Sequence, residues 1–282
     1  MKKLLALLLS GMCIMSLAAC SNDAQPTTED AAATTGEAAD SDYAYITSNG
    51  KLVIGITEYA PMNYYDEDGT LIGFDTEFAE AVCEKLGVTP EFQIIDWDMK
   101  ETELKARNID CIWNGLTVTE ERCANMSFTT SYLTNKQCVV INSSNADVYT
   151  DAASLASALI SAEGGSAGET AILSDADLSQ ASYTASNSQA DALLALKAGN
   201  YDAIVIDYTM ACASVGSGDY ADMMIVDGIT LANEEYAIGF RTDSDMAEKV
   251  NAVIEELMAD GTLAALAEKY ELTELYNAAV NE

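Results

Sequence analysis

Residues 51–113 alternate between short apolar runs and longer stretches in which apolar residues recur at helical spacing. The runs predict buried strands, and the periodic stretches predict amphipathic helices. The predicted strands cover residues 51–56, 92–95 and 109–113, and the predicted helices cover residues 74–86 and 99–107. We expect Asp75 to cap the first helix and Gly87 to end it. Strand–helix–strand–helix–strand is typical of a parallel sheet with helices on its faces, which makes the fold class α/β.

The same alternation returns later in the chain. A helix is predicted from Ala190 to an end at Gly199-Asn200, and a buried strand follows over residues 201–207. Asp207 ends this strand, and ligands bind at such strand ends in open α/β sheets. On its own, Asp207 is also consistent with a helix cap. Residues 246–257 carry one apolar helical face, and a last helix is predicted over residues 263–270.

The third predicted strand continues into Asn114-Gly115-Leu116-Thr117-Val118-Thr119-Glu120-Glu121-Arg122. Gly115 allows the backbone to turn and to come close to a ligand. Thr117 and Thr119 supply hydroxyl groups, and the guanidinium of Arg122 can meet both oxygens of a carboxylate. The segment therefore predicts a carboxylate receptor, with a strand–turn–helix junction and a solvated Arg122 as the alternative.

The N-terminus has a pattern of its own. Two lysines precede an apolar run over residues 4–17, which is too short to span a bilayer, and Leu-Ala-Ala-Cys20 follows. This ending resembles the lipobox of bacterial lipoproteins, which implies that residues 1–19 are a signal peptide and that Cys20 is lipidated. The alternative is an uncleaved signal anchor. Residues 20–42 are acidic and contain no aliphatic residue larger than Ala, so we expect a disordered tether.

Composition excludes several classes of function. The chain has 13 basic and 46 acidic residues and a formal net charge of -33, which disfavours nucleic acid as a partner. It contains no histidine, so Ser-His-Asp catalysis, Cys-His catalysis and His-ligated zinc are excluded. We expect no catalytic residues, no metal and no cofactor. The cysteines after Cys20 have no Cys-x-x-Cys spacing, so we expect buried thiols, with one disulfide left open, at Cys83, Cys111, Cys123, Cys138 and Cys212.

Four motifs occur in order along the chain, namely Gly73-Phe74-Asp75, Asp96-Trp97-Asp98, the Gly115–Arg122 segment and Phe128-Thr129-Thr130-Ser131-Tyr132. Together they resemble the extracellular solute-binding proteins of family 3, the amino-acid receptors of ABC importers, over about residues 50–275. The resemblance implies a type II periplasmic-binding-protein fold, with two α/β lobes, two hinge crossings and a ligand in the cleft. The implied crossings lie near residues 132–136 and 232–236. They divide the body into lobe one (residues 43–134 and 234–282) and lobe two (residues 135–233).

The resemblance also implies how an amino acid is held. Arg122 would pair with the ligand carboxylate, helped by Thr117 and by backbone N–H groups near Ser166. Asp207 would pair with the ammonium, helped by the carbonyl of Gly115 and the hydroxyl of Thr117. Tyr59 and Trp97 match family positions that contact the ligand side chain, although plain core packing is the alternative for both. The implied ligand-binding residues are Tyr59, Trp97, Asn114, Gly115, Thr117, Arg122, Ser166 and Asp207.

Two acids depart from the family pattern. The loop over residues 55–61 looks one residue short, and Glu58 is the candidate for the polar contact near its start. Glu163 stands where a basic or amide residue is frequent. If either acid faces the cleft, cationic side chains such as those of arginine and lysine are favoured. The alternative is that both are solvated.

The favoured function is a monomeric binding module without catalysis that hands a free amino acid to an ABC permease. The lipid anchor would hold it on the outer side of the cytoplasmic membrane, at the cell surface or in a periplasm. One alternative is a ligand-sensing surface lipoprotein. Another is a dehydratase of the same fold acting on a cyclic carboxylate, which requires a positioned acid or base. The sequence identifies no spare carboxylate for that step.

Overall fold

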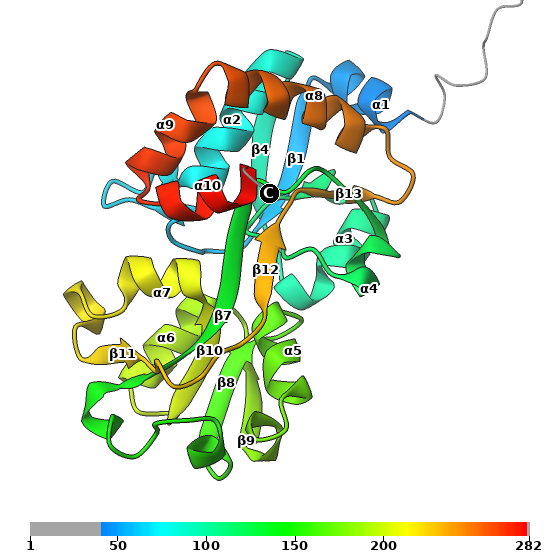
Figure 1. Ribbon diagram of the computed structural model, residues 1–282. Helices are drawn as coiled ribbons and strands as arrows, with labels where there is room; N and C mark the ends of the chain where they lie inside the picture. The colour runs from blue at the N-terminus through cyan, green and yellow to red at the C-terminus, as the bar shows by residue number, and fades with distance from the viewer. Residues whose placement is uncertain (1–40, 281–282) are drawn as a thin grey trace, which may run out of the picture. The chain divides into compact units, whose positions relative to one another are not determined.

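A computed structural model describes residues 41–280 of the chain, which form two α/β lobes (Figure 1). The strands of lobe one are β1 (Lys51–Ile56), β4 (Thr89–Ile94), β5 (Cys111–Ile112), β6 (Met126–Phe128) and β13 (Gly239–Arg241), with a small hairpin of β2 (Tyr64–Tyr65) and β3 (Leu71–Ile72). The strands of lobe two are β7 (Leu133–Asn142), β8 (Leu159–Glu163), β9 (Ser182–Ser186), β10 (Ala203–Asp207) and β11 (Met223–Ile225). The spatial orders are β4-β1-β5-β13-β6 and β11-β7-β10-β8-β9. The predicted two-lobed α/β fold is thus confirmed.

Helices surround both sheets. Those of lobe one are α1 (Asp42–Asn49), α2 (Phe74–Leu86), α3 (Lys100–Lys105), α4 (Glu120–Cys123), α8 (Met246–Ala259), α9 (Thr262–Lys269) and α10 (Thr273–Val280). Those of lobe two are α5 (Ala167–Ser174), α6 (Gln189–Lys197) and α7 (Tyr208–Ser214). Short 3-10 turns are η1 (Trp97–Met99), η2 (Ser143–Asn145), η3 (Ala153–Leu155), η4 (Leu178–Gln180) and η5 (Gly218–Tyr220).

The sheet of lobe one is buried on both faces. Strand β1 pairs in parallel with β4 and β5, as predicted, whereas β13 is antiparallel to β5 and β6. Alternate residues of a strand point to opposite faces. Leu52 and Ile54 belong to the same core cluster as Phe78 of α2 and Val250 of α8. Ile112 of β5 instead belongs to the cluster on the α3 side of the sheet. Burial on both faces explains the continuous apolar runs in the sequence.

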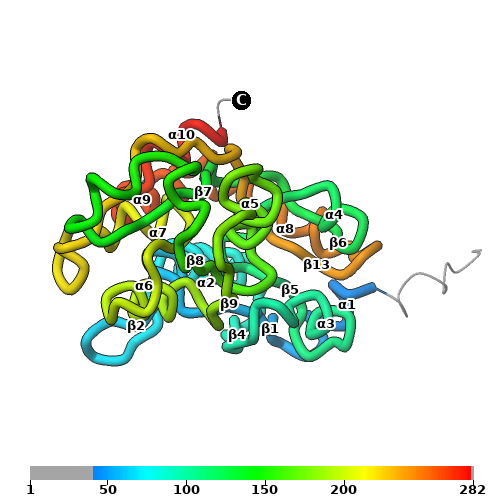
Figure 2. Tube along the Cα trace, turned by 90° about the horizontal axis from the view of Figure 1, so that it is seen from below, coloured from blue at the N-terminus to red at the C-terminus, as the bar shows by residue number. Residues whose placement is uncertain are grey.

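Lobe two follows the same principle. In β10, Val205 packs in one cluster with Ile172 of α5, whereas Ile204 packs in another with Leu193 of α6. The two helices therefore cover opposite faces of the sheet, as the view from below also indicates (Figure 2). This arrangement leaves the carboxyl ends of β8 and β10 directed at lobe one.

Two antiparallel strands connect the lobes. The first residues of β7 pair with β12 (Asn233–Tyr236), so that Lys136 faces Asn233 and Leu133 faces Tyr236 (Figure 1). The segments expected to cross near residues 132–136 and 232–236 form this pair. Helix α10 packs against β7, and the hydroxyl of Thr134 donates to the carbonyl of Leu275 at 3.2 Å.

The start of α2 differs from its prediction. Gly73 is the N-cap residue and has no side-chain cap, so the expected cap at Asp75 was wrong. The Asp75 carboxylate is buried and accepts from the backbone N–H of Gly115 at 2.7 Å and from the hydroxyl of Tyr132 at 2.9 Å. An acid at the first turn of a helix is thus used to fix a distant turn. The predicted stop at Gly87 is confirmed, because Gly87 has a left-handed φ of 71°.

The N-terminal predictions fall largely on residues that the structure does not describe. The signal peptide over residues 1–19, the lipidated Cys20 and most of the tether lie outside residues 41–280. The last two tether residues, Ser41 and Asp42, instead belong to the folded body, because Ser41 caps α1 and Asp42 is buried. Within the described part of the chain, no helix is long and apolar enough to cross a bilayer.

The five cysteines of the described region are free thiols. Cys83, Cys111 and Cys138 are buried, and burial raises their pKa values. The expectation of burial was wrong for Cys123 and Cys212, which are exposed.

A buried ion-pair network on Arg241 ties α1 to the sheet of lobe one. Its Nε donates to Asp42 at 2.9 Å, and its Nη2 donates to Asp110 at 3.1 Å. We expect Arg241→Ala to lower the free energy of unfolding by about 3–5 kcal/mol, because it leaves the buried Asp110 without an ion-pair partner and the buried Asp42 with only the half-exposed Arg107. Urea unfolding followed by circular dichroism measures the loss. Arg107→Ala is the control, since the half-exposed Arg107 contacts the same Asp42 at 2.8 Å and should contribute about 1 kcal/mol or less.

Candidate functional site

A small cavity lies between the two lobes at the carboxyl ends of β8 and β10. Its volume of about 10 Å³ is close to the space that one water molecule needs. The lining residues are Trp97, Asn114, Gly115, Thr117, Arg122, Glu163, Ser166, Ala167, Gln189 and Asp207. The structure thus brings together all but one of the predicted ligand-binding residues, together with Glu163.

Arg122 reaches this cavity because of the turn that precedes it. The Thr119 hydroxyl caps α4 by accepting from the Arg122 N–H at 3.1 Å. Arg122 is only 8% exposed, and burial is the main cause that lowers the pKa of its guanidinium. It donates to the carbonyl oxygens of Thr117 at 2.8 Å and of Gly165, in lobe two, at 3.1 Å. The alternative of a solvated Arg122 is therefore excluded.

Asp207 lies on the opposite side of the cavity at the end of β10. Its carboxylate accepts from the amides of Asn135 and Gln137, both at 2.6 Å, and from the amide of Gln189 through a very short bond. Burial raises its pKa, whereas these amides favour the charged form. Besides these three amides, a hydrogen bond from the Tyr236 hydroxyl also favours the charged form of Asp207. Asp207 does not cap α7 with its side chain.

Glu234 adjoins Asp207 and was not predicted from the sequence. It lies on the crossing strand β12, and its carboxylate accepts from the amides of Asn135 and Gln137 at 3.0 Å and from the hydroxyl of Thr117 at 3.2 Å. The same two amides therefore bridge two carboxylates. Burial, and next the charge of Asp207, raise the pKa of Glu234 to about 7.

Glu163 is the other acid of the site. Its side chain lines the cavity and is 2% exposed, and its Oε1 has no hydrogen-bond partner. Burial, and next the charge of Asp207, raise the pKa of this carboxyl to about 8. The structure therefore does supply a spare carboxylate in the cleft, contrary to the sequence-based expectation.

Lys100 is a buried cation that was also missed. Its Nζ donates to the carbonyl of Trp97 at 3.1 Å and to the carbonyl of Gly165 at 2.8 Å, and it lies 5.0 Å from the centre of the Trp97 ring. Burial lowers its pKa to about 8. Lys100 and Arg122 thus both hold Gly165 of lobe two from lobe one.

Gly165 also explains how closely the lobes approach. Its φ is 68°, and a Cβ atom at this position would lie 2.9 Å from Cα and Oδ1 of Asp98. Only glycine permits this conformation and this contact without strain.

The turn at Asn114 and Gly115 has a structural role that was not predicted from the sequence. The Asn114 amide bonds the backbone and the hydroxyl of Thr57 at 2.8–3.0 Å, which fixes the end of β1. Gly115 has a φ of 57°, and a Cβ atom there would lie 2.7 Å from the Tyr59 ring. Tyr59 is buried beside the cavity, and its hydroxyl bonds that of Tyr236 at 2.7 Å. Tyr59 therefore supports the site and does not line its cavity.

Two further expectations differ from the observed contacts. Ser166 lines the cavity, but its hydroxyl caps α5 by accepting from Glu169 N at 3.1 Å. The nearby N–H groups of Gly165 and Ser166 already donate to Glu169 Oε2 and to the Glu163 carbonyl. Glu58 is exposed and is not among the cavity-lining residues.

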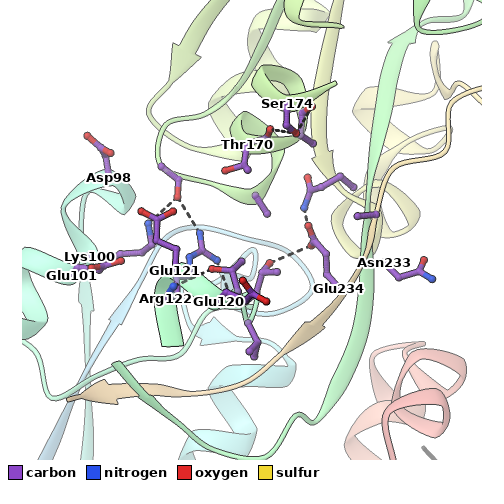
Figure 3. Close-up of a pocket in the computed structure, with 18 of the residues that line it drawn as sticks. Asp98, Lys100, Glu101, Glu120, Glu121, Arg122, Thr170, Ser174, Asn233 and Glu234 are labelled. Carbon is purple, nitrogen blue, oxygen red and sulfur yellow. Dashed lines mark hydrogen bonds between the residues drawn. The ribbon is translucent and has the colours of Figure 1, made fainter. Parts of the chain in front are cut away.

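A wider cleft of about 900 Å³ opens next to the cavity (Figure 3). Thr117, Arg122 and Ala167 line both spaces, and Lys100 and Glu234 line the outer cleft. The cleft provides the room that the cavity lacks. With Arg122 from lobe one and Asp207 from lobe two, the site can pair an anionic and a cationic group of one small molecule.

Comparison with known proteins identifies one family. The model of the family described as bacterial extracellular solute-binding proteins, family 3, matches residues 52–273. The L-cystine-binding protein TcyJ of Escherichia coli (strain K12) is 26% identical over 227 residues, which is 80% of this chain and 84% of that protein. An L-arginine-binding protein of Pseudomonas aeruginosa is 30% identical over 241 residues, which is 79% of this chain and 88% of that protein.

Solved structures show the same fold. An amino acid ABC transporter substrate-binding protein from Streptococcus pneumoniae, crystallised with L-arginine, superposes with a TM-score of 0.74 at 28% identity. The match covers 82% of this chain and 97% of that protein.

The raised pKa of Glu163 predicts a dependence of stability on pH. The folded state holds this proton up to about pH 8, whereas an unfolded glutamic acid loses it near 4.5. Between these values the folded state binds more protons, so the stability contributed by this group falls as pH rises. We expect Glu163→Gln to melt several degrees higher than the wild type at pH 8.5, with a smaller difference at pH 5.5. Thermal unfolding at both pH values measures it.

Glu255→Gln is the control, because it removes an exposed acid from α8. Its melting temperature should equal that of the wild type at both pH values. Equal melting temperatures of wild type and Glu163→Gln at both pH values would contradict this account of Glu163.

Proposed function

We propose that this chain, which belongs to the bacterial extracellular solute-binding proteins of family 3, captures a free amino acid between its lobes and delivers it to an ABC permease. The observation that carries the proposal is that two opposite charges, one from each lobe, line the same cavity. Arg122 comes from lobe one and Asp207 from lobe two, and both line the same space. A free amino acid presents a carboxylate and an ammonium on one carbon, and burying either group unpaired is expensive.

Closure follows from contacts that exist only when the lobes meet. The carbonyl of Gly165 now accepts from both Arg122 and Lys100, at the position where a ligand carboxylate would accept. In the proposed cycle the lobes open, the ligand carboxylate takes over contacts of the Arg122 guanidinium, and the ligand ammonium pairs with the Asp207 carboxylate. A ligand that is satisfied at both ends only in the closed form shifts the equilibrium toward that form.

The hinge strands take part in the same recognition. Asn135 and Gln137 of β7 orient Asp207, and Glu234 of β12 accepts from Thr117 of lobe one. Movement of the lobes therefore changes the surroundings of the ligand ammonium directly. This coupling supports a receptor that reports occupancy through its degree of closure.

The location of the protein is proposed from the sequence. Residues 1–19 would direct export, and lipidation of Cys20 would anchor the protein through a tether on the outer side of the cytoplasmic membrane. An anchored receptor needs no second copy to reach its permease, and we propose that it acts as a monomer.

A dehydratase acting on a cyclic carboxylate has one observation in its favour. Glu163 is a buried carboxyl whose pKa of about 8 suits a general acid. The family and the relatives described above are nevertheless named for binding. Turnover of prephenate or arogenate by the purified protein would favour the enzyme.

A thermal-shift screen tests the proposed function. The probes are the twenty amino acids, ornithine and cystine, each added to the purified protein. A ligand that binds only the folded state adds about 2.7 kcal/mol to its stability at a ligand concentration of a hundred times the Kd. This added stability raises the melting temperature. We expect at least one amino acid to shift the melting curve. A screen in which none does so would reject the proposal.

Substitution of Arg122 tests the site itself. We expect Arg122→Ala to weaken binding of the amino acid found in the screen by at least ~2 kcal/mol, roughly thirtyfold, because the ligand carboxylate loses its partner. Asp207→Asn should cost a similar amount at the ammonium. Isothermal titration calorimetry measures both, with Arg107→Ala as the control outside the cleft. Affinity within threefold of the wild type would remove Arg122 from the site.

A further inference from the structure

Glu163 is the one charged group of the cavity that an ordinary amino acid would leave unpaired. The cavity is lined by three charged side chains, those of Arg122, Asp207 and Glu163. A ligand carboxylate satisfies the first and a ligand ammonium the second. The carboxyl of Glu163 would then stay buried without a partner, which is expensive for the charged form.

Within the described residues 41–280, no protein group takes this partner role. Oε1 of Glu163 lacks a hydrogen bond, and none of the ion pairs formed within residues 41–280 includes Glu163. Lys100 is a nearby candidate, but its ammonium is held by the carbonyls of Trp97 and Gly165. The Arg122 guanidinium is likewise held by Thr117 and Gly165. The acid is therefore aimed into the ligand space with its acceptor capacity unused.

We infer that Glu163 is a specificity determinant that selects amino acids whose side chain ends in a positive charge. This inference rests on the proposed function and names the ligand class of the same site. The terminal guanidinium or ammonium would pair with Glu163 and complete the charge balance of the cavity. Trp97 lines the same cavity.

The pairing links binding to a proton. Ligand-free Glu163 is largely protonated below pH 8, and a bound cation favours its charged form, so binding releases the proton. The groups that act on Glu163 are Asp207 and Asp96, which favour the proton, and Lys100 and Arg122, which oppose it. Affinity for a cationic side chain should therefore rise with pH up to about 8 and then level off.

Arginine and citrulline separate this effect from all others. They share the α-carboxylate and α-ammonium and differ in a charged guanidinium against a neutral urea group. Titration of Asp207, Glu234 or Lys100 acts on the shared end and largely cancels in the ratio of the two dissociation constants. The ratio of citrulline Kd to arginine Kd thus reports the partner of the side chain.

The experiment is calorimetric titration of the purified wild type, Glu163→Gln and Glu255→Gln with both ligands at pH 6.0 and pH 8.5. We expect the wild type to bind arginine at least tenfold tighter than citrulline at pH 8.5, with a smaller ratio at pH 6.0. Glu163→Gln should reduce the ratio at pH 8.5 at least tenfold and make it independent of pH. Glu255→Gln, which removes an exposed acid on α8, should behave as the wild type.

The remaining outcomes overturn the inference in distinguishable ways. If the wild type binds amino acids with a ratio near one, or if Glu163→Gln leaves the ratio unchanged, the specificity role fails while the proposed function stands. Equal loss of both ligands in Glu163→Gln would place the acid at the shared amino-acid end and also contradict the inference. If no amino acid binds the wild type, the proposed function fails and the inference fails with it.

Discussion

The cost of removing charges from water governs the space between the lobes. Asp207 is satisfied within the protein by three amides, and Arg122 by two carbonyls, one of which belongs to the other lobe. Glu163 has no such partner. The groups therefore differ in what they require of a ligand, because only an unpaired buried charge gains its full interaction from the molecule that binds.

The hinge strands serve both mechanics and recognition. Strands β7 and β12 pair between the lobes, and the side chains of Asn135, Gln137 and Glu234 on them surround the carboxylate of Asp207. A change in the angle between the lobes must alter this hydrogen-bonded group. In the proposed cycle, closure and ligand contact would therefore be one event, without a separate signal between hinge and site.

Local strand and helix patterns predicted the α/β class. The short motifs, through the family that they resemble, implied the two lobes and most of the residues that line the cavity. Prediction from the sequence failed where burial depends on segments that meet only in the fold. Glu234 lies in a polar stretch that looks solvated, and it is buried only because Thr117, Asn135 and Gln137 converge on it. The prediction that Asp75 caps its helix was wrong for the same reason. An acid in the first turn of a helix predicts a cap, but the donors that hold it come from residues 115 and 132.

An unpaired acid at this position is a cost in stability that a binding protein can use. In the closed form without ligand, Glu163 either keeps a proton or carries an uncompensated charge, and both disfavour closure relative to a form in which the acid meets water. If Glu163 pairs with a ligand cation as inferred, such a ligand would remove this penalty in addition to making its own contacts. The same residue would then disfavour closure without ligand and favour closure on a cationic side chain, which is differential affinity between two states. A glutamine at position 163 would relieve the penalty and lose the discrimination, so stability and specificity are opposed at this one side chain.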